Sequence, residues 1–151
     1  MNLYAKQLIR RFEGLSYRPY RCPAGRWTIG WGHKIVGQES FSVLTDKEVE
    51  ALLDQDLRIR MHQLYRLITV PLTPYQEGAL LSFLYNVGAA ALQRSTLRMK
   101  LNREDYHGAE DEFQRWVWAR GVRLRGLTAR RMAEAQCYSG DVSMKKIQIN
   151  I

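Results

Sequence analysis

The chain has 151 residues, of which 46% are hydrophobic, and its formal net charge is +8 at pH 7. This composition excludes an intrinsically disordered protein, and the length is sufficient for one domain with a hydrophobic core. No apolar run approaches the roughly 20 residues of a membrane span, and two cysteines, Cys22 and Cys137, are too few for a disulfide framework. The positive charge indicates a polyanionic partner.

The N-terminal segment predicts an amphipathic helix over residues 2–11. Asn2 can serve as its N-cap, and three apolar residues fall on one face. The helix is expected to end near Gly14, because glycine commonly terminates helices. The same segment lacks the apolar region and cleavage site of a secretory signal. We therefore expect the protein to accumulate in the cytoplasm.

Residues 15–36 have a different character. Five residues that favour strands occur there, namely Tyr17, Tyr20, Trp27, Ile29 and Trp31. The sequence PAG at 23–25 indicates a turn between them. These features predict a small antiparallel hairpin or three-stranded ribbon. It must pack against helices, because so small a sheet is not stable alone.

Helices dominate the remainder of the chain. The sequence TDKE at 45–48 is a capping box, and the apolar period that follows predicts a helix to about residue 68. The sequence TPYQ at 73–76 opens a second helix, which is apolar on nearly all sides and ends at Gly88. Shorter helices are predicted over residues 95–101, 105–119 and 128–138, with Asp105 and Thr128 as caps of the last two. The tail at 144–151 is expected to be an edge strand or a frayed end.

Together these elements predict an α+β fold that is mainly helical, with a small N-terminal sheet. We expect a single domain over residues 1–151, with two lobes and a cleft between them. The smaller, β-containing lobe spans about residues 12–60. The helical lobe comprises residues 1–11 and 61–151, and the long helix joins the two.

Arginines are concentrated in one segment, residues 113–133, which contains no acidic residue. They are Arg115, Arg120, Arg123, Arg125, Arg130 and Arg131. Such a segment is either a solvated basic face or a wall that faces a polyanion, and charge alone favours neither. No cluster of cysteine and histidine has zinc-ligand spacing, and no glycine-rich nucleotide motif is present, so neither a metal nor a cofactor is expected.

Glu13 is the first candidate catalytic residue. An acidic side chain at a helix C-terminus is unfavourable, because it meets the negative end of the helix dipole. Taken alone, it is best interpreted as an exposed glutamate. Its aromatic neighbours change the interpretation, since a partly buried carboxylic acid can stay protonated near neutral pH and donate a proton to a leaving oxygen.

Glycoside hydrolysis needs a second group on the other side of the scissile bond. The segment from Leu15 to His33 has no acid, but it contains Cys22 and Thr28. A cysteine could attack the sugar or activate a water only as the thiolate, and a threonine hydroxyl could orient a water. Alone, Cys22 would be interpreted as a small buried residue and Thr28 as a strand residue. The interpretation as an active site depends on the set.

These residues resemble the signature of the phage endolysins of the bacteriophage-lysozyme type. That signature is Glu, eight residues, Asp or Cys, five residues, Thr, and it matches Glu13, Cys22 and Thr28. The segments RFEG, WTIGWGH, LTPYQEGALLSFLYNVG and GLTARRMAE are similar to family segments and occur in the family order. The resemblance extends from Leu8 to about Gly140.

The resemblance implies a lysozyme-like fold with the substrate cleft between two lobes. The implied reaction is hydrolysis of the β-1,4 bond between N-acetylmuramic acid and N-acetylglucosamine in peptidoglycan, for lysis of the host cell. Glu13 would be the general acid, Cys22 would replace the catalytic aspartate, and Thr28 would position the water or intermediate. Either Arg130 or Arg131 would approach Glu13.

Further residues are candidates for the substrate groove: Trp31, Lys34, Gln93 and Arg130. For Trp31, core packing is an equally good interpretation, and His33 is interpreted as structural. A cysteine in place of aspartate leaves the stereochemical course open. Direct attack by the thiolate would retain the anomeric configuration, and activation of a water would invert it.

The expected partner is bacterial peptidoglycan, bound by a monomer that makes weak contact with anionic outer-membrane lipid. The enzyme is expected to stay in the host cytoplasm until the membrane is permeabilised and then to reach the periplasm. Three alternatives remain: a basic nucleic-acid-binding domain, which lacks any recognisable motif; a lysozyme fold that binds peptidoglycan without cleaving it; and a lytic transglycosylase.

Overall fold

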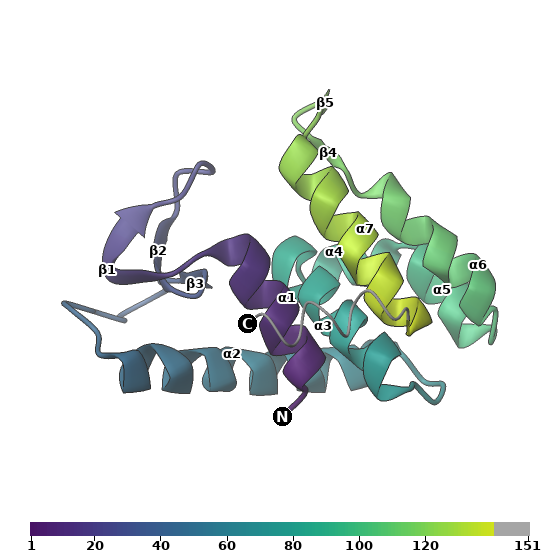
Figure 1. The fold of residues 1–151 in the computed structure, drawn as a ribbon, viewed down its shortest axis with the longest axis horizontal. Coiled ribbons are helices and arrows are strands. Elements are labelled where there is room, and N and C mark those ends of the chain that lie inside the picture. The colour runs from purple at the N-terminus through teal and green to yellow at the C-terminus, as the bar shows by residue number, and fades with distance from the viewer. Residues whose placement is uncertain (141–151) are drawn as a thin grey trace.

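The computed structural model describes residues 1–140. Its helices are α1 (Leu3–Glu13), α2 (Asp46–Leu67), α3 (Pro74–Val87), α4 (Ala89–Arg94), α5 (Thr96–Asn102), α6 (Tyr106–Glu112) and α7 (Arg125–Ser139). Figure 1 shows a three-stranded sheet at one end, most helices at the other, and α2 running along the side of both. This is the α+β arrangement that the sequence predicts. Within the described part of the chain, no helix combines the length and apolar character needed to cross a membrane.

The three predicted N-caps on the main helices are confirmed. The Asn2 side chain accepts a hydrogen bond from the Ala5 N–H at 3.0 Å, which starts α1. Thr45 and Thr73 each complete a capping box, at the beginnings of α2 and α3. Because these caps satisfy backbone donors that have no partner within the helix, they fix where each helix begins.

The small sheet is antiparallel and has the order β1 (Ser16–Arg21), β2 (Trp27–Gly30), β3 (His33–Lys34). Thr28 lies at its centre, since it pairs with Tyr20 of β1 and with Lys34 of β3. The register of β1 and β2 shifts between Ser16 and Tyr20, as at a β-bulge. The sheet leans on α2, where Val49 and Leu52 lie against Gly30. It therefore has the helical support that its small size requires.

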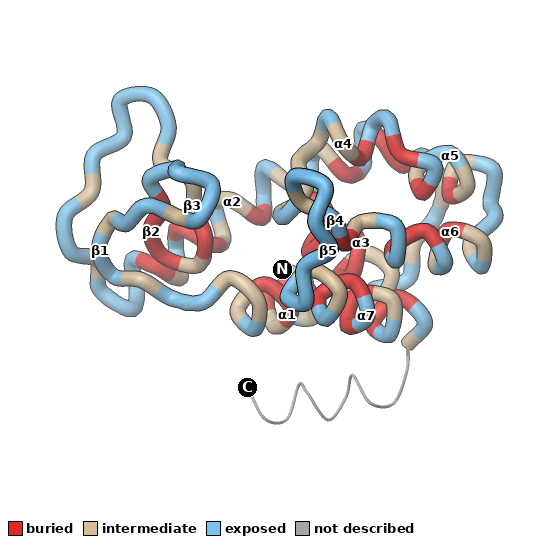
Figure 2. Tube along the Cα trace, turned by 90° about the horizontal axis from the view of Figure 1, so that it is seen from above, coloured by how far each residue is buried: buried red, intermediate tan, exposed pale blue. Residues whose placement is uncertain are grey.

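The hydrophobic core lies among α1, α3 and α7, with α2 and α5 closing it. The central helix α3 buries Leu80, Leu81, Phe83 and Leu84 completely. Figure 2 shows buried residues along α1, α3 and α7, whereas the turn between β1 and β2 and the hairpin of β4 and β5 are exposed. The helical side thus holds most of the buried core, whereas in the sheet only β2 is largely buried.

The predicted helix over residues 105–119 is wrong in its second half. Asp105 caps α6 as expected, but the helix ends at Glu112, and a 3₁₀ turn covers Phe113–Arg115. A short hairpin of β4 (Trp118–Ala119) and β5 (Val122–Arg123) follows. Trp118 and Val122 favour strands, and a turn with positive φ at Arg120 and Gly121 connects them, which no helix can accommodate.

Two further boundaries differ from prediction. Helix α7 begins at Arg125, three residues before the predicted start, and Thr128 does not cap it, because its hydroxyl donates to the Leu124 carbonyl within the first turn. The short helix α4 was not predicted. The predicted element at 144–151 lies outside the described residues.

The arginine-rich segment does not form a single face. Arg130 and Arg131 are buried, at 3% and 0% exposure, whereas the other four arginines are exposed around the hairpin of β4 and β5. The two buried residues are therefore available for a site inside the protein, and the four exposed ones for the surface.

Candidate active site

Glu13 is the last residue of α1, and an arginine from α7 meets it there. Arg130 donates from one guanidinium nitrogen to Glu13 Oε2 at 2.6 Å. Both side chains are largely buried, at 16% exposure for Glu13 and 4% for Arg130. The guanidinium also lies over the Phe12 ring, 5.8 Å from its centroid. Of the two arginines proposed from the sequence, Arg130 is therefore the one that contacts Glu13.

A buried network holds Arg130 in place. Its Nε lies 3.3 Å from Glu134 Oε2, and its other guanidinium nitrogen donates to the Ser82 carbonyl at 3.1 Å. The Ser82 hydroxyl donates to the same Glu134 oxygen at 2.6 Å. Glu134 and Ser82 are both completely buried. The guanidinium is thus fixed on three sides before it reaches Glu13.

Arg131 completes this network on its far side. It forms an ion pair with Glu134, with Nε and Oε1 2.8 Å apart but not aligned as a hydrogen bond, and it donates to Asn86 at 2.8 Å. Burial raises the pKa of Glu134 and lowers that of Arg131, while their ion pair opposes both shifts. Glu134 thus lies between two guanidiniums, and Glu13 provides the second anion for Arg130.

Gly32 provides the space for the Glu13 carboxylate. Its φ is +83°, and a Cβ at this position would lie 2.5 Å from Glu13 Oε1. A side chain is therefore excluded by both backbone conformation and contact. The glycine brings the backbone between β2 and β3 against the proton-donor candidate.

Cys22 lies in the turn that connects β1 and β2. Its N–H donates to the Arg26 carbonyl at 2.9 Å, and its own carbonyl accepts from Gly25 at 2.8 Å. The backbone N–H of Arg26 lowers the pKa of the Cys22 thiol, and although burial opposes the shift, Ala24, Thr28 and Lys34 add to it. The thiolate is therefore stabilised mainly by hydrogen bonds from its own turn.

Thr28 links Cys22 to a cation. Its hydroxyl accepts from Lys34 Nζ at 3.5 Å, and its one proton can be donated either to the Arg26 carbonyl, 3.0 Å away, or to the Cys22 thiolate. Thr28 is completely buried, because its strand lies in the middle of the sheet. Cys22, Thr28 and Lys34 therefore form one group on the sheet side.

Tyr20 lies near both groups. Burial raises the pKa of its phenol, and the negative charges of Glu13 and Cys22 raise it further. Tyr20 is thus within electrostatic range of both the glutamate on the helical side and the thiol on the sheet side. No cluster of potential metal ligands occurs among residues 1–140.

A pocket of about 260 Å³ opens beside this region. It is lined from the sheet, α2 and α3, and its lining includes Arg26, Gly32, Lys34, Arg60 and Tyr85. Lys34 lies in this lining, whereas Glu13, Cys22 and Thr28 do not, and the role of Lys34 in binding substrate stays a prediction. The Tyr85 hydroxyl donates to the Trp31 carbonyl at 2.6 Å, which joins the core helix to the sheet.

His33 occupies one wall of the same pocket between two carboxylates. Its Nδ1 lies 2.7 Å from Asp56 Oδ2, and its Nε2 lies 3.1 Å from Glu39 Oε1. Burial disfavours its charged form, yet the two carboxylates raise its pKa above the ordinary value. The ring thus joins β3 to α2 and to the loop after the sheet.

Two predicted substrate-binding residues lie elsewhere. The Trp31 ring packs against the core and lies below Arg10, 5.7 Å from its guanidinium carbon. Gln93 is exposed at the end of α4, beside a different surface hollow that it shares with Arg98 and Met99. Neither has a described contact with Glu13, Cys22 or Thr28.

Sequence reasoning missed Glu134 and Ser82, which hold Arg130. Arg130 and Glu134 are four residues apart, which places them on one helix face, so this pair could have been found. Ser82 could not, because nothing in an apolar helix marks one serine as the partner of a glutamate 52 residues away.

Known proteins match this chain over most of its length. Residues 10–134 match the family model described as phage lysozyme. The SAR-endolysin of Escherichia phage Mu is 43% identical over 129 residues, which cover 85% of this chain and 75% of the relative.

Two solved structures are similar as well. The endolysin from Escherichia coli O157:H7 phage FAHEc1 has a TM-score of 0.81 and 30% identity, and the match covers 90% of each chain. The muramidase domain of SpmX from Asticaccaulis excentricus has a TM-score of 0.79 and 31% identity, and covers 90% of this chain and 95% of its own. The sequence match over most of the chain and the shared fold place this protein in the phage lysozyme family.

Proposed function

We propose that this protein is an endolysin that hydrolyses the β-1,4 bond between N-acetylmuramic acid and N-acetylglucosamine in peptidoglycan, with Glu13, Cys22 and Thr28 as its catalytic set. Membership of the phage lysozyme family makes it a peptidoglycan-hydrolysing glycosidase. The observation that carries the residue assignment is the contact of Arg130 with the largely buried Glu13, and the lowered pKa of the Cys22 thiol supports it.

Glu13 is the proton donor in this proposal. It transfers its proton to the glycosidic oxygen as the bond to the anomeric carbon breaks. Arg130 holds the carboxylate in one position and stabilises the anion that remains after the transfer. Because Glu134, Ser82 and Phe12 fix Arg130, the donor needs little reorganisation during the reaction.

Cys22 acts on the opposite face of the sugar. As a thiolate it either attacks the anomeric carbon, which retains the configuration after hydrolysis, or takes a proton from a water that attacks, which inverts it. Thr28 and Lys34 stabilise the thiolate and orient the attacking group. The anomeric configuration of the first product separates the two courses.

The substrate follows the pocket between sheet and helices, so the molecule works as one domain with two lobes. Lys34 contacts the substrate, whereas Arg130, with 4% of its side chain exposed, acts through Glu13. Trp31 and Gln93 lie away from this site. The enzyme acts as a monomer without cofactor. It reaches the wall from the cytoplasm after membrane permeabilisation, and its basic surface adds weak contact with anionic lipid.

The test is clearing of a suspension of outer-membrane-permeabilised Gram-negative cells, together with the mass of the products. Glu13→Gln should abolish clearing, whereas the exposed Glu104→Gln, which removes the same charge, should clear like the wild type. A hydrated reducing end is expected, and an anhydro sugar would indicate a transglycosylase. Full clearing by folded Glu13→Gln would refute the assignment.

A further inference from the structure

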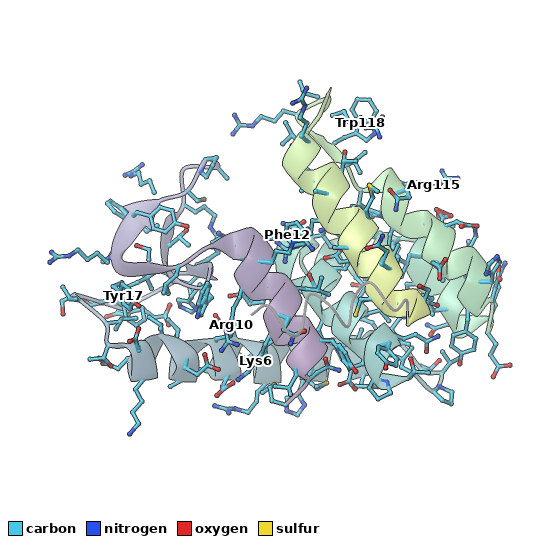
Figure 3. All side chains as sticks on the ribbon, in the orientation of Figure 1. Lys6, Arg10, Phe12, Tyr17, Arg115 and Trp118 are labelled. Atoms are coloured by element: carbon cyan, nitrogen blue, oxygen red, sulfur yellow. The ribbon has the colours of Figure 1, made fainter. Side chains whose placement is uncertain are left out.

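The hairpin of β4 and β5 exposes apolar and basic side chains together. Trp118, Val122 and Leu124 are 60%, 58% and 42% exposed. Arg120, Arg123 and Arg125 are exposed around them. We refer to these six residues as the hairpin patch. Figure 1 shows the hairpin projecting beyond the N-terminal end of α7, at the edge opposite α2, and Figure 3 shows Trp118 extending from it into solvent.

The patch has an ordered geometry. Trp118 and Arg123 are directly opposite each other in the antiparallel pair, so that their side chains emerge on the same face. Ala119 and Val122 form the other pair, on the other face. Trp118 and Arg123 therefore share one face of the ribbon, and Val122 lies on the opposite face.

The tip of the hairpin keeps an arginine where the backbone disfavours one. Arg120 and Gly121 both have positive φ, +52° and +79°, as in a type I′ turn. Asparagine, aspartate and glycine suit the first of these positions, whereas a long side chain there is strained. Among residues 1–140, the Arg120 side chain forms no hydrogen bond, ion pair or ring contact that would offset this strain.

The first turn of α7 is a second place where the residues present are unfavourable for local stability. Leu124 provides no side-chain cap, the first turn has no acidic residue, and its first residue is Arg125. A cation at this end of a helix is opposed by the helix dipole. Arg120 and Arg125 thus both carry positive charge at a cost in local stability, which is the pattern expected where a surface has a function.

We propose that the hairpin patch binds an anionic phospholipid surface, with Trp118 entering the interface and the arginines contacting phosphate groups. Arginines alone would suit any polyanion, and a tryptophan can also stack on a sugar ring, but the exposed valine and leucine beside them gain most from an apolar environment. A tryptophan beside basic residues is typical of the boundary between headgroups and acyl chains. This binding is separate from cleavage and does not depend on the proposed catalytic set.

The experiment is sedimentation of the whole protein with vesicles that contain no sugar polymer. Vesicles of phosphatidylcholine with phosphatidylglycerol are compared with vesicles of phosphatidylcholine alone. We expect binding to the first only, and weakening as salt increases, because the phosphate contacts are screened. Equal binding to both vesicle types would overturn the proposal.

Variants test the residues. Trp118→Ala and Arg123→Gln should each weaken vesicle binding about tenfold. The matched control is Arg58→Gln, which removes the same charge from the exposed side of α2 and should bind like the wild type. A loss in Arg58→Gln as large as in Arg123→Gln would show that only net charge matters, and would overturn the proposal.

Arg120→Gly separates binding from folding. Glycine relieves the positive φ, so the unfolding midpoint should stay the same or rise while vesicle binding falls. A glycine variant that binds vesicles like the wild type would contradict the role of the tip. If duplex DNA is bound and vesicles are not, the surface belongs to a nucleic-acid partner and the proposal fails.

Discussion

The helical side and the sheet side of the proposed active site are built by different means. Glu13 is held by Arg130, which is fixed by a glutamate and a serine with no exposed surface. Cys22 lies in a turn between two short strands, and backbone N–H groups and a neighbouring hydroxyl stabilise its thiolate. Buried side chains thus hold Glu13, the proposed proton donor, whereas the local backbone positions the Cys22 thiol.

This difference separates stability from chemistry. Changes to the helical side disturb a buried charge network and should lower both stability and activity. The turn that contains Cys22 is mostly exposed, so substitutions there should alter activity with little change in stability. The following variants test that distinction.

The largest expected effect is in activity at Cys22. Cys22→Ser should lose on the order of 10³-fold or more in turnover, because a serine hydroxyl is not ionised near neutral pH. Cys22→Asp should retain much of the activity, since the carboxylate replaces the thiolate. Turnover on purified peptidoglycan and the unfolding midpoint check this. A marked fall of the midpoint in the serine variant would contradict the distinction between the two sides.

The activities of the wild type and of Cys22→Asp should depend on pH in different ways. The lowered pKa of Cys22 means that its thiolate forms at lower pH than that of an ordinary cysteine, and activity should fall as pH drops through that pKa. In Cys22→Asp the acidic limb of the pH–activity profile should move to still lower pH, because the ordinary pKa of an aspartic acid lies below that of a cysteine. An acidic limb at the same pH in both proteins would assign it to another group.

The second effect is expected from the opposite side. Glu134→Gln leaves two buried arginines without their shared anion, and should lower the free energy of unfolding by about 3–5 kcal/mol. Turnover of the folded fraction should fall on the order of 100-fold, since Arg130 is no longer held against Glu13. Chemical denaturation and turnover measure the two losses. Glu110→Gln, a glutamate outside this network, is the control and should lose neither.

A smaller effect is expected where the two sides meet. Gly32→Ala places a methyl group against Glu13 and requires positive φ, so the free energy of unfolding should fall by about 1–2 kcal/mol. Turnover should fall by about tenfold, because the displaced carboxylate meets the substrate in a different position. Gly37 also has a positive φ, but nothing lies within 4 Å of an added Cβ. Gly37→Ala therefore separates the effect of backbone strain from the effect of displacing the Glu13 carboxylate. Equal turnover in the two variants would contradict the contact.

The smallest effect concerns stability alone. The raised pKa of His33 means that its ion pairs stabilise the fold at low pH, and that this contribution is lost as pH rises through that pKa. His33→Asn should therefore lower the unfolding midpoint clearly at about pH 5 and much less at about pH 9. Thermal unfolding across this range measures the difference. The same loss at both pH values would mean that the imidazole contributes by packing only.

Sequence reasoning succeeded where local chemistry decides the structure. The capping boxes at Thr45 and Thr73 mark helix starts whatever surrounds them. The hairpin of β4 and β5 was missed, because its strands have two residues each and its positive-φ position holds an arginine. The choice of Arg130 over Arg131 depends on how α7 packs against α1, and adjacent arginines are indistinguishable without that packing.

The central claim is that Cys22 is the reactive thiol of the site. Cys137 provides an internal comparison, since it is completely buried and burial raises its pKa to about 12. Iodoacetamide labelling, followed by peptide mass and residual turnover, tests the claim most directly. The account predicts that Cys22 is labelled first, that activity falls in proportion to its labelling, and that Cys22→Asp resists the reagent. Full activity in a protein completely labelled at Cys22 would contradict it.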